Sequence, residues 1–308
     1  MSEESSEKSL RAPAKAVPLF SFARVWTIAS STVTQLVRMK TFYFLLAFAL
    51  IIVGIGNFNI PATPAKELSM IKKVAFGTMD LFAWLFAIIS TALLIPRDQE
   101  DRTLYTILSK PVRRIEYLFG KLFGVLAVVA TSLVAMFVIC AIMIYSRETL
   151  YVSAEIQAME ANAQYTPEEM QAQVELIRQQ GLRPELTVAV LASFLKASVV
   201  AAVTIFISTF ASSSLFTIII SILVFLIGHA HSLLSNYWTT QTDNIFVIQA
   251  VKVIKVIIPN FQLFSFSEGI VQGAPIIAAV LWQMVGLTGG YLIVYVLLSL
   301  LVFVDKEF

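Results

Sequence analysis

Hydrophobic residues in this chain gather into long runs instead of alternating with polar ones. Six runs lie near the roughly 20 apolar residues that a helix needs to cross a bilayer, so the pattern predicts six transmembrane helices. A charged segment, 97–114, separates the second run from the third, and a hydrophilic insertion, 147–185, follows the third. The predicted spans are 41–60, 74–95, 116–145, 186–210, 214–234 and 276–304.

The segment 20–38 has the periodicity of an amphipathic helix. A helix with one apolar and one polar face lies in the membrane interface, whereas the alternative, a helix of a soluble domain, has nothing soluble nearby to pack on. Residues 1–19 are rich in Ser, Glu and Lys and predict a disordered tail without a cleavable signal peptide. The apolar face carries Phe22, Trp26, Ala29, Val33 and Leu36, and the polar face carries Arg24, Ser31, Gln35 and Arg38.

The charged segment 97–114 is patterned as a compact helix of about two turns and not as a plain connector. Leu104, Ile107 and Leu108 share one face at helical spacing, and charges crowd both ends. Pro111 ends the helix because proline cannot continue it. Such an element at a membrane surface favours contact with another protein.

Composition and charge fit the membrane prediction and orient it. The 308 residues are 58% hydrophobic and only 14% charged, against roughly 25% charged in an average soluble domain. Half of the 22 Lys and Arg residues lie in the tail, the segment 20–38 and the region 97–121. Because basic residues favour the cytoplasmic side, we expect these parts and both termini inside, and the insertion 147–185 outside.

The insertion predicts an external helical hairpin. Thr166 to Glu169 combine an N-cap, a proline at the first helical position and a capping box. Gly181 provides the stop, and a helix around 152–159 would pair with this one. The alternative is a surface that handles substrate or docks a partner. The later segment 245–258 is apolar but short and contains two lysines, which predicts a re-entrant helix.

Motifs for intrinsic chemistry are missing from the sequence. Gly120-Lys121 lacks the other positions of a phosphate-binding loop. His229 and His231 do not share a helix face, and no carboxylate or cysteine stands beside them. Cys140 is the one cysteine and lies in an apolar run. We therefore expect no enzymatic activity, no metal or cofactor in this chain, and no nucleic-acid partner.

Two ionisable residues fall inside predicted spans. Asp80 in the second span and Lys196 in the fourth lie at comparable depth. A charge in hydrocarbon costs several kcal/mol unless it is paired or hydrated, so the two residues form an ion pair or share a wet cavity on the translocation route. The alternative has Lys196 extending to the outer interface and Asp80 capping its helix.

Glycines at G-x-x-x-G spacing indicate places where helices approach closely. One such pair is Gly120 and Gly124, at the start of the third span. The other pair is Gly286 and Gly290, in the last span.

The segment 90–125 resembles the membrane subunits of type-2 ATP-binding-cassette (ABC) transporters, which carry a helix between their second and third spans and open the third span with Gly-Lys. Arg102 stands where many relatives have glycine. The nearest likeness is to bacterial permeases associated with copper-enzyme maturation. The matching positions are Glu100, Thr103, Leu104, Leu108, Pro111, Arg114, Gly120 and Lys121.

The resemblance implies an all-α fold over residues 20–308, with an interfacial elbow helix, six spans and short re-entrant helices before the last span. It also implies a dimer with a second copy or a paralogue, and separate cytoplasmic ATPase subunits that bind ATP and Mg²⁺ and grip the segment 97–114. The resemblance also implies roles for the residues of this segment. Apolar contact with the ATPase would come from Leu104, Ile107 and Leu108. The helix would be oriented by Glu100, Arg102 and Arg114 and completed by Thr103 and Pro111.

The expected protein is therefore the permease half of an exporter in the bacterial cytoplasmic membrane. Two alternatives stay open. In an ion-coupled secondary transporter, Asp80 and Lys196 would couple transport to an ion gradient. In a membrane scaffold without transport, the external hairpin would bind a partner.

Overall fold

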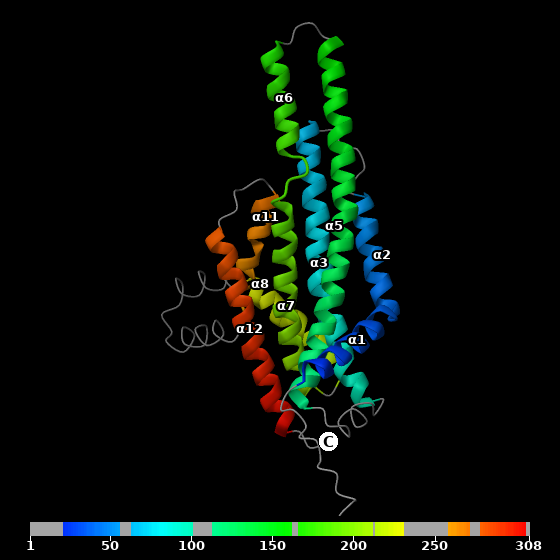
Figure 1. Cartoon of the computed structure of the whole chain (residues 1–308), viewed down its shortest axis with the longest axis vertical. Coiled ribbons are helices and arrows are strands. Elements are labelled where there is room, and N and C mark those ends of the chain that lie inside the picture. The colour runs from blue at the N-terminus through cyan, green and yellow to red at the C-terminus, as the bar shows by residue number, and fades with distance from the viewer. Residues whose placement is uncertain are drawn as a thin grey trace, which may run out of the picture.

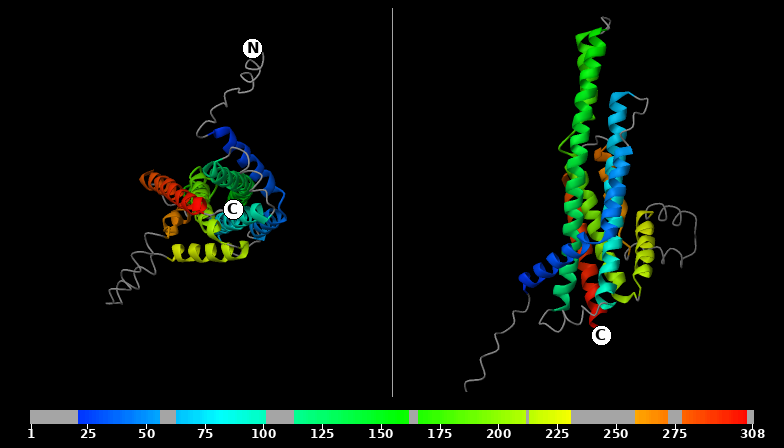
Figure 2. Two further views of the ribbon diagram at one scale, coloured as in Figure 1. Left: turned by 90° about the horizontal axis from the view of Figure 1, so that it is seen from below. Right: turned by 90° about the vertical axis from the view of Figure 1, so that its right-hand side faces the viewer.

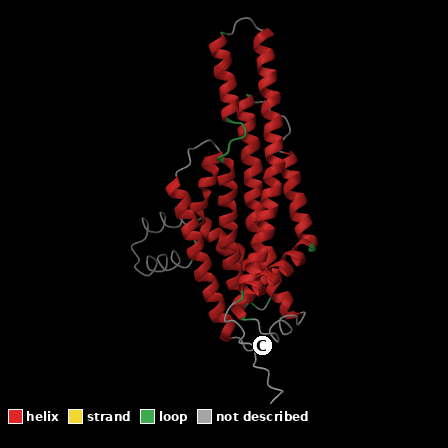
Figure 3. Ribbon diagram, viewed as in Figure 1, coloured by secondary structure: helices red, strands yellow, loops and turns green. Residues whose placement is uncertain are grey.

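The computed structural model describes residues 21–55, 63–100, 113–161, 166–211, 213–230, 258–271 and 278–305. Within these ranges the regular structure is helical, without strands (Figure 3). The elements are α1 (Phe22–Val37), α2 (Lys40–Ile55), α3 (Pro64–Glu100), α5 (Arg114–Ala161), α6 (Pro167–Gln179), α7 (Leu186–Phe210), α8 (Ser214–His229), the 3₁₀ turn η2 (Phe261–Ser265), α11 (Phe266–Val271) and α12 (Ala278–Asp305).

Three long helices form the centre of the bundle. α3, α5 and α7 run side by side, and α2, α8 and α12 flank them (Figures 1 and 2). α7 is the most enclosed of the apolar helices because Ala, Ser and Val dominate its sequence and let neighbours come close. The start of α1 and the end of α12 lie at the same end of the bundle (Figure 1).

The helix lengths agree with a polytopic membrane protein. By length and apolar composition, α3, α5, α7 and α12 each suffice to cross a bilayer, whereas α1 and α2 qualify only as a pair bent by 65°. α8 is apolar but has 16 residues. The six predicted spans correspond to α2, α3, α5, α7, α8 and α12, with α1 as the bent helix before them.

The helical hairpin predicted at 147–185 is built differently from the prediction. The separate helix expected around 152–159 is the continuation of α5, which runs unbroken for 48 residues. At 1.5 Å per residue this helix is about 70 Å long, more than twice the roughly 30 Å hydrocarbon core. α6 packs against its far end (Figure 1).

The predicted capping box at the start of α6 is present. The Thr166 hydroxyl accepts a hydrogen bond from the Glu169 backbone N–H, and the Glu169 carboxylate accepts one from the Thr166 backbone N–H at 2.9 Å. This backbone hydrogen bond to the charged form lowers the pKa of Glu169 below its usual range. The first turn of α6 therefore keeps its cap at neutral pH.

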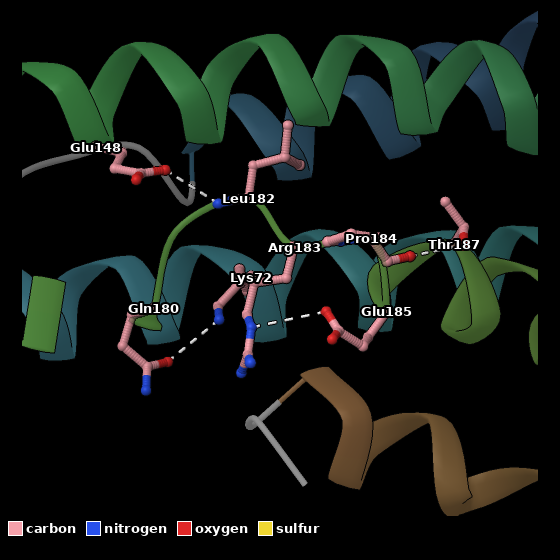
Figure 4. A network of polar contacts seen from close by, with 8 residues as sticks. All are labelled: Lys72, Glu148, Gln180, Leu182, Arg183, Pro184, Glu185 and Thr187. Atoms are coloured by element: carbon pink, nitrogen blue, oxygen red, sulfur yellow. Dashed lines mark hydrogen bonds and ion pairs between the residues drawn. The ribbon is translucent and has the colours of Figure 1, made fainter. Parts of the chain in front are cut away.

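A polar network fixes the connection from α6 to α7 (Figure 4). The Leu182 N–H donates to Glu148 Oε2 at 3.1 Å, and Lys72 Nζ donates to Gln180 Oε1 at 3.1 Å. A Cβ on Gly181 would overlap the Glu148 carboxylate, so the predicted stop residue is glycine for close approach. The network ties this connection to both α3 and α5.

α1 crosses α5 over the predicted glycine pair. A Cβ on Gly120 would lie 2.6 Å from Ile28 Cβ, and a Cβ on Gly124 would lie 2.5 Å from Thr32 Cβ. Both distances are shorter than van der Waals contact, and Cβ atoms cannot rotate away. The crossing therefore requires glycine at both positions.

We predict that Gly124→Ala destabilises the protein and Gly286→Ala does not. No described atom lies within 4 Å of a Cβ added at Gly286, so this matched change on α12 meets open space. Overpacking costs about 1–3 kcal/mol, which lowers the melting temperature by roughly 2 to 10 °C. Thermal unfolding of the purified proteins tests this, and equal melting temperatures would contradict the tight crossing.

Candidate functional site

A buried carboxylate joins the beginnings of α1 and α5. Glu116 is fully buried in the first turn of α5. Its Oε1 accepts the backbone N–H of Ser21 at 2.7 Å and lies 3.0 Å from Arg24 Nη2. Its Oε2 accepts the backbone N–H of Arg113 at 3.0 Å. Ser21 is the N-cap of α1 and Arg113 directly precedes α5, so one side chain caps both helices.

A second polar contact also joins α1 to α5. Lys121 Nζ donates to Gln35 Oε1 at 3.3 Å and lies 5.7 Å from the centre of the Tyr117 ring. The lysine is 5% exposed, so its charge is held inside the joint and not in solvent. We call this set, with Glu116 and the two glycines, the α1–α5 joint. The joint holds α1 at a fixed place on α5.

The α1–α5 joint borders the predicted coupling segment. Glu100 is the last residue described in α3, and Arg114 is the first residue of α5. The structure therefore places Glu100 at the end of α3 and not in a separate short helix. Arg102, Thr103, Leu104, Ile107, Leu108 and Pro111 lie outside the described residues, as do the tail 1–19 and residues 245–257 of the predicted re-entrant segment.

The structure brings the two intramembrane charges together. Lys196 Nζ donates to Asp80 Oδ2 at 2.8 Å, which links α7 to α3. The Lys196 side chain is 5% exposed and the Asp80 side chain is 25% exposed. The lysine amine thus points into the bundle toward Asp80. A role of this pair in transport stays a prediction.

Aromatic rings lie beside the Lys196 end of the ion pair. Lys196 Nζ lies 5.7 Å from the centre of the Phe225 ring, a cation–π distance. Trp84 stacks on Phe225 with 4.2 Å between ring centres, and Phe261 lies 5.2 Å from the same ring. The cluster joins α3, α7, α8 and η2. It therefore holds α8 against the ion pair.

Two of these features were missed in the sequence. The apolar run predicts Glu116 only as the start of a span, although an acidic residue three positions after Arg113 has the spacing of half a capping box. Trp84 stands one helical turn after Asp80, which places it on the same face. Neither signal identifies the residue on another helix that Glu116 or Trp84 contacts.

The structure gives fewer contacts for the other residues that the sequence singled out. No described atom lies within 4 Å of a Cβ added at Gly286 or Gly290, so their packing role stays a prediction. Cys140 is buried, and His229 lies 5.9 Å from the Phe225 ring. Among the described residues no three His, Cys, Asp or Glu side chains gather as metal ligands.

Fold and charge placement define a polytopic helical membrane protein, and comparison with protein families makes the class specific. The family model described as ABC-2 family transporter protein matches residues 62–308. Because the match covers most of the chain, this protein belongs to the ABC-2 family and is a membrane permease subunit of an ABC transporter. A search of curated proteins finds no significant match. The family match begins after α2, so α1 and its joint rest on the structure and the sequence.

We predict that Asp80 and Lys196 are coupled energetically. Asp80→Asn leaves a buried ammonium without its counter-ion and is the more damaging change, while Lys196→Met leaves a carboxylate that is partly exposed. The double variant is milder than the sum of both, with a coupling of about 0.5–3 kcal/mol. Unfolding of the four proteins in detergent measures this, and strictly additive effects would rule out the coupling.

Proposed function

We propose that this permease is one half of an exporter driven by a separate ATPase subunit that docks on residues 97–114. The partner binds ATP and Mg²⁺, and a second copy or a paralogue completes the membrane part. The absence of a phosphate-binding loop in the sequence supports a hydrolytic site on another chain. The membrane is the bacterial cytoplasmic membrane.

Charge supports a cytoplasmic position for the end of the bundle that carries α1. Residues 21–63 contain no Asp or Glu, and Arg24, Arg38 and Lys40 lie at the two ends of α1. Arg113 and Arg114 begin α5 at the same place. Basic residues near the ends of spans favour the cytoplasm, so both termini and the docking segment face the ATPase.

The observation that carries the proposal is the Glu116 carboxylate. It holds the N-terminal turns of α1 and α5 together directly after the docking segment. A force applied to residues 97–114 therefore moves α1 and α5 as one unit. This rigid joint is what a coupling element needs, because nucleotide binding must favour one of two membrane arrangements.

The second route from the docking segment runs along α3. This helix is continuous from Pro64 to Glu100, so displacement of its end reaches Asp80, 20 residues away, at about 30 Å. At Asp80 the helix is tied to Lys196 on α7. Separating α3 from α7 breaks this pair, so the ion pair acts as a lock on one of the two arrangements.

Co-purification with the ATPase tests the docking segment. We expect Leu104→Asp to weaken recovery of the ATPase by about tenfold or more, since the central apolar contact of an interface costs 2 kcal/mol or more when lost. Glu100→Ala lowers both recovery and the stimulation of ATP hydrolysis by the permease. The matched control is Leu150→Asp, an exposed leucine on the far part of α5.

The outcomes separate docking from general damage. Unchanged association and unchanged ATPase coupling in both variants would disprove docking at 97–114. Equal loss in Leu150→Asp would show that the apolar-to-acidic change acts through the fold. Loss restricted to the segment variants supports the proposal.

A further inference from the structure

An apolar groove lies beside the α1–α5 joint, and nothing in the proposed mechanism uses it. It has a volume of about 640 Å³, within the range of ligand sites, and its lining is almost wholly apolar. Phe22, Trp26 and Ser30 line it from α1, Phe123 and Ala127 from α5, and Phe194 from α7.

The groove is open and its rings are exposed. Trp26 is 69% exposed and Phe22 is 71% exposed, although both lie on the predicted apolar face of α1. The face of α1 buried on α5 consists instead of Val25, Ala29, Thr32 and Leu36. An interfacial helix buries its apolar side chains among acyl chains, so these rings face lipid.

The direction of the groove follows the span. Its α5 wall extends from Phe123 to Ala130, seven residues or about 10 Å along the helix axis. α5 crosses the membrane, so the groove runs from the level of α1 into the bilayer. This is the direction of a phospholipid acyl chain.

The charges around α1 select the headgroup. Arg24, Arg38 and Lys40 stand on α1 and at its end, and no acidic residue occurs in 21–63. Glu116 is fully buried and already bound to Arg24 and two backbone N–H groups. Glu116 balances the charge of Arg24, which leaves the exposed Arg38 and Lys40 at the C-terminal end of α1 as the basic residues of this surface. Basic residues at a membrane surface attract anionic lipids, so this end of α1 is complementary to an anionic phosphate headgroup.

We propose that the groove binds one acyl chain of an anionic bilayer phospholipid, whose headgroup lies at Arg38 and Lys40, at the C-terminal end of α1. The lipid fills the space between α1, α5 and α7 and so supports the α1–α5 joint. This inference depends on the membrane position of α1 and not on ATPase docking, so either proposal can fail without the other.

Fluorescence quenching of Trp26 tests the site. Trp84→Phe, Trp238→Phe and Trp282→Phe leave Trp26 as the single tryptophan of the full chain. The protein is placed in phosphatidylcholine vesicles with a minor fraction of phosphatidylglycerol, and bromine is attached to the acyl chains of one lipid at a time. At equal mole fraction we expect brominated phosphatidylglycerol to quench about two- to fivefold more than brominated phosphatidylcholine.

Groove-filling variants with matched controls locate the effect. Ala127→Phe and Ser30→Phe fill the groove from opposite walls and abolish the preference. Ala135→Phe and Ser31→Phe add the same ring at exposed positions outside the groove and retain it. Both pairs carry exposed residues, so a folding defect is expected in neither.

Three results would overturn the proposal. Equal quenching by both lipids shows contact with bulk bilayer only. A preference that survives both groove-filling variants places the anionic lipid elsewhere. Weak quenching by either lipid shows that protein, such as a second copy of the chain, covers Trp26.

Discussion

The geometry of this permease depends on the carboxylate of Glu116 in a fully buried position. A buried charge is tolerated only when hydrogen bonds and a counter-ion replace its water. Two backbone N–H groups and Arg24 provide them, and they come from the first turns of two helices. Loss of this carboxylate removes the cap from both helices and takes away the acidic partner of Arg24. The angle of α1, the groove beside it and the entry into α5 all follow from this contact.

Polar contacts specify the arrangement because apolar packing alone discriminates little between helices in lipid. Among the described residues, two sets of such contacts lie at different depths of the bundle. Glu116 and Lys121 fix the end that carries α1, and Asp80 with Lys196 fixes α3 to α7 deeper in the bundle. Close approach at Gly120 and Gly124 completes the first contact, and the rings around Phe225 complete the second. In the proposed mechanism, motion of α3 relative to α7 therefore breaks the ion pair between Asp80 and Lys196.

Much of this could be read in the sequence because local rules decide it. The apolar runs give the helices, the capping box starts α6, and the glycine spacing marks a close helix approach on α5, whose partner α1 only the structure identifies. Equal depth brings Asp80 to Lys196. Prediction failed where partners from distant segments decide. The polar residues after Tyr145 predict a break between the third span and a separate helix around 152–159, but packing against α6 and α3 keeps α5 helical to Ala161. The same holds for Glu116, whose spacing shows a cap on α5 and gives no sign of α1.

In the proposed mechanism, α1 and α5 move as one unit when the ATPase binds nucleotide. Spin labels at exposed Thr27 on α1, Thr131 on α5 and Leu215 on α8 report this in the intact complex, and native Cys140 is buried away from the label. Double electron–electron resonance measures the distances between pairs of these labels, once without nucleotide and once with ATP trapped in the complex. We expect an unchanged distance from Thr27 to Thr131 and a changed distance from Thr27 to Leu215. A change between Thr27 and Thr131 as large as that to Leu215 would contradict this mechanism.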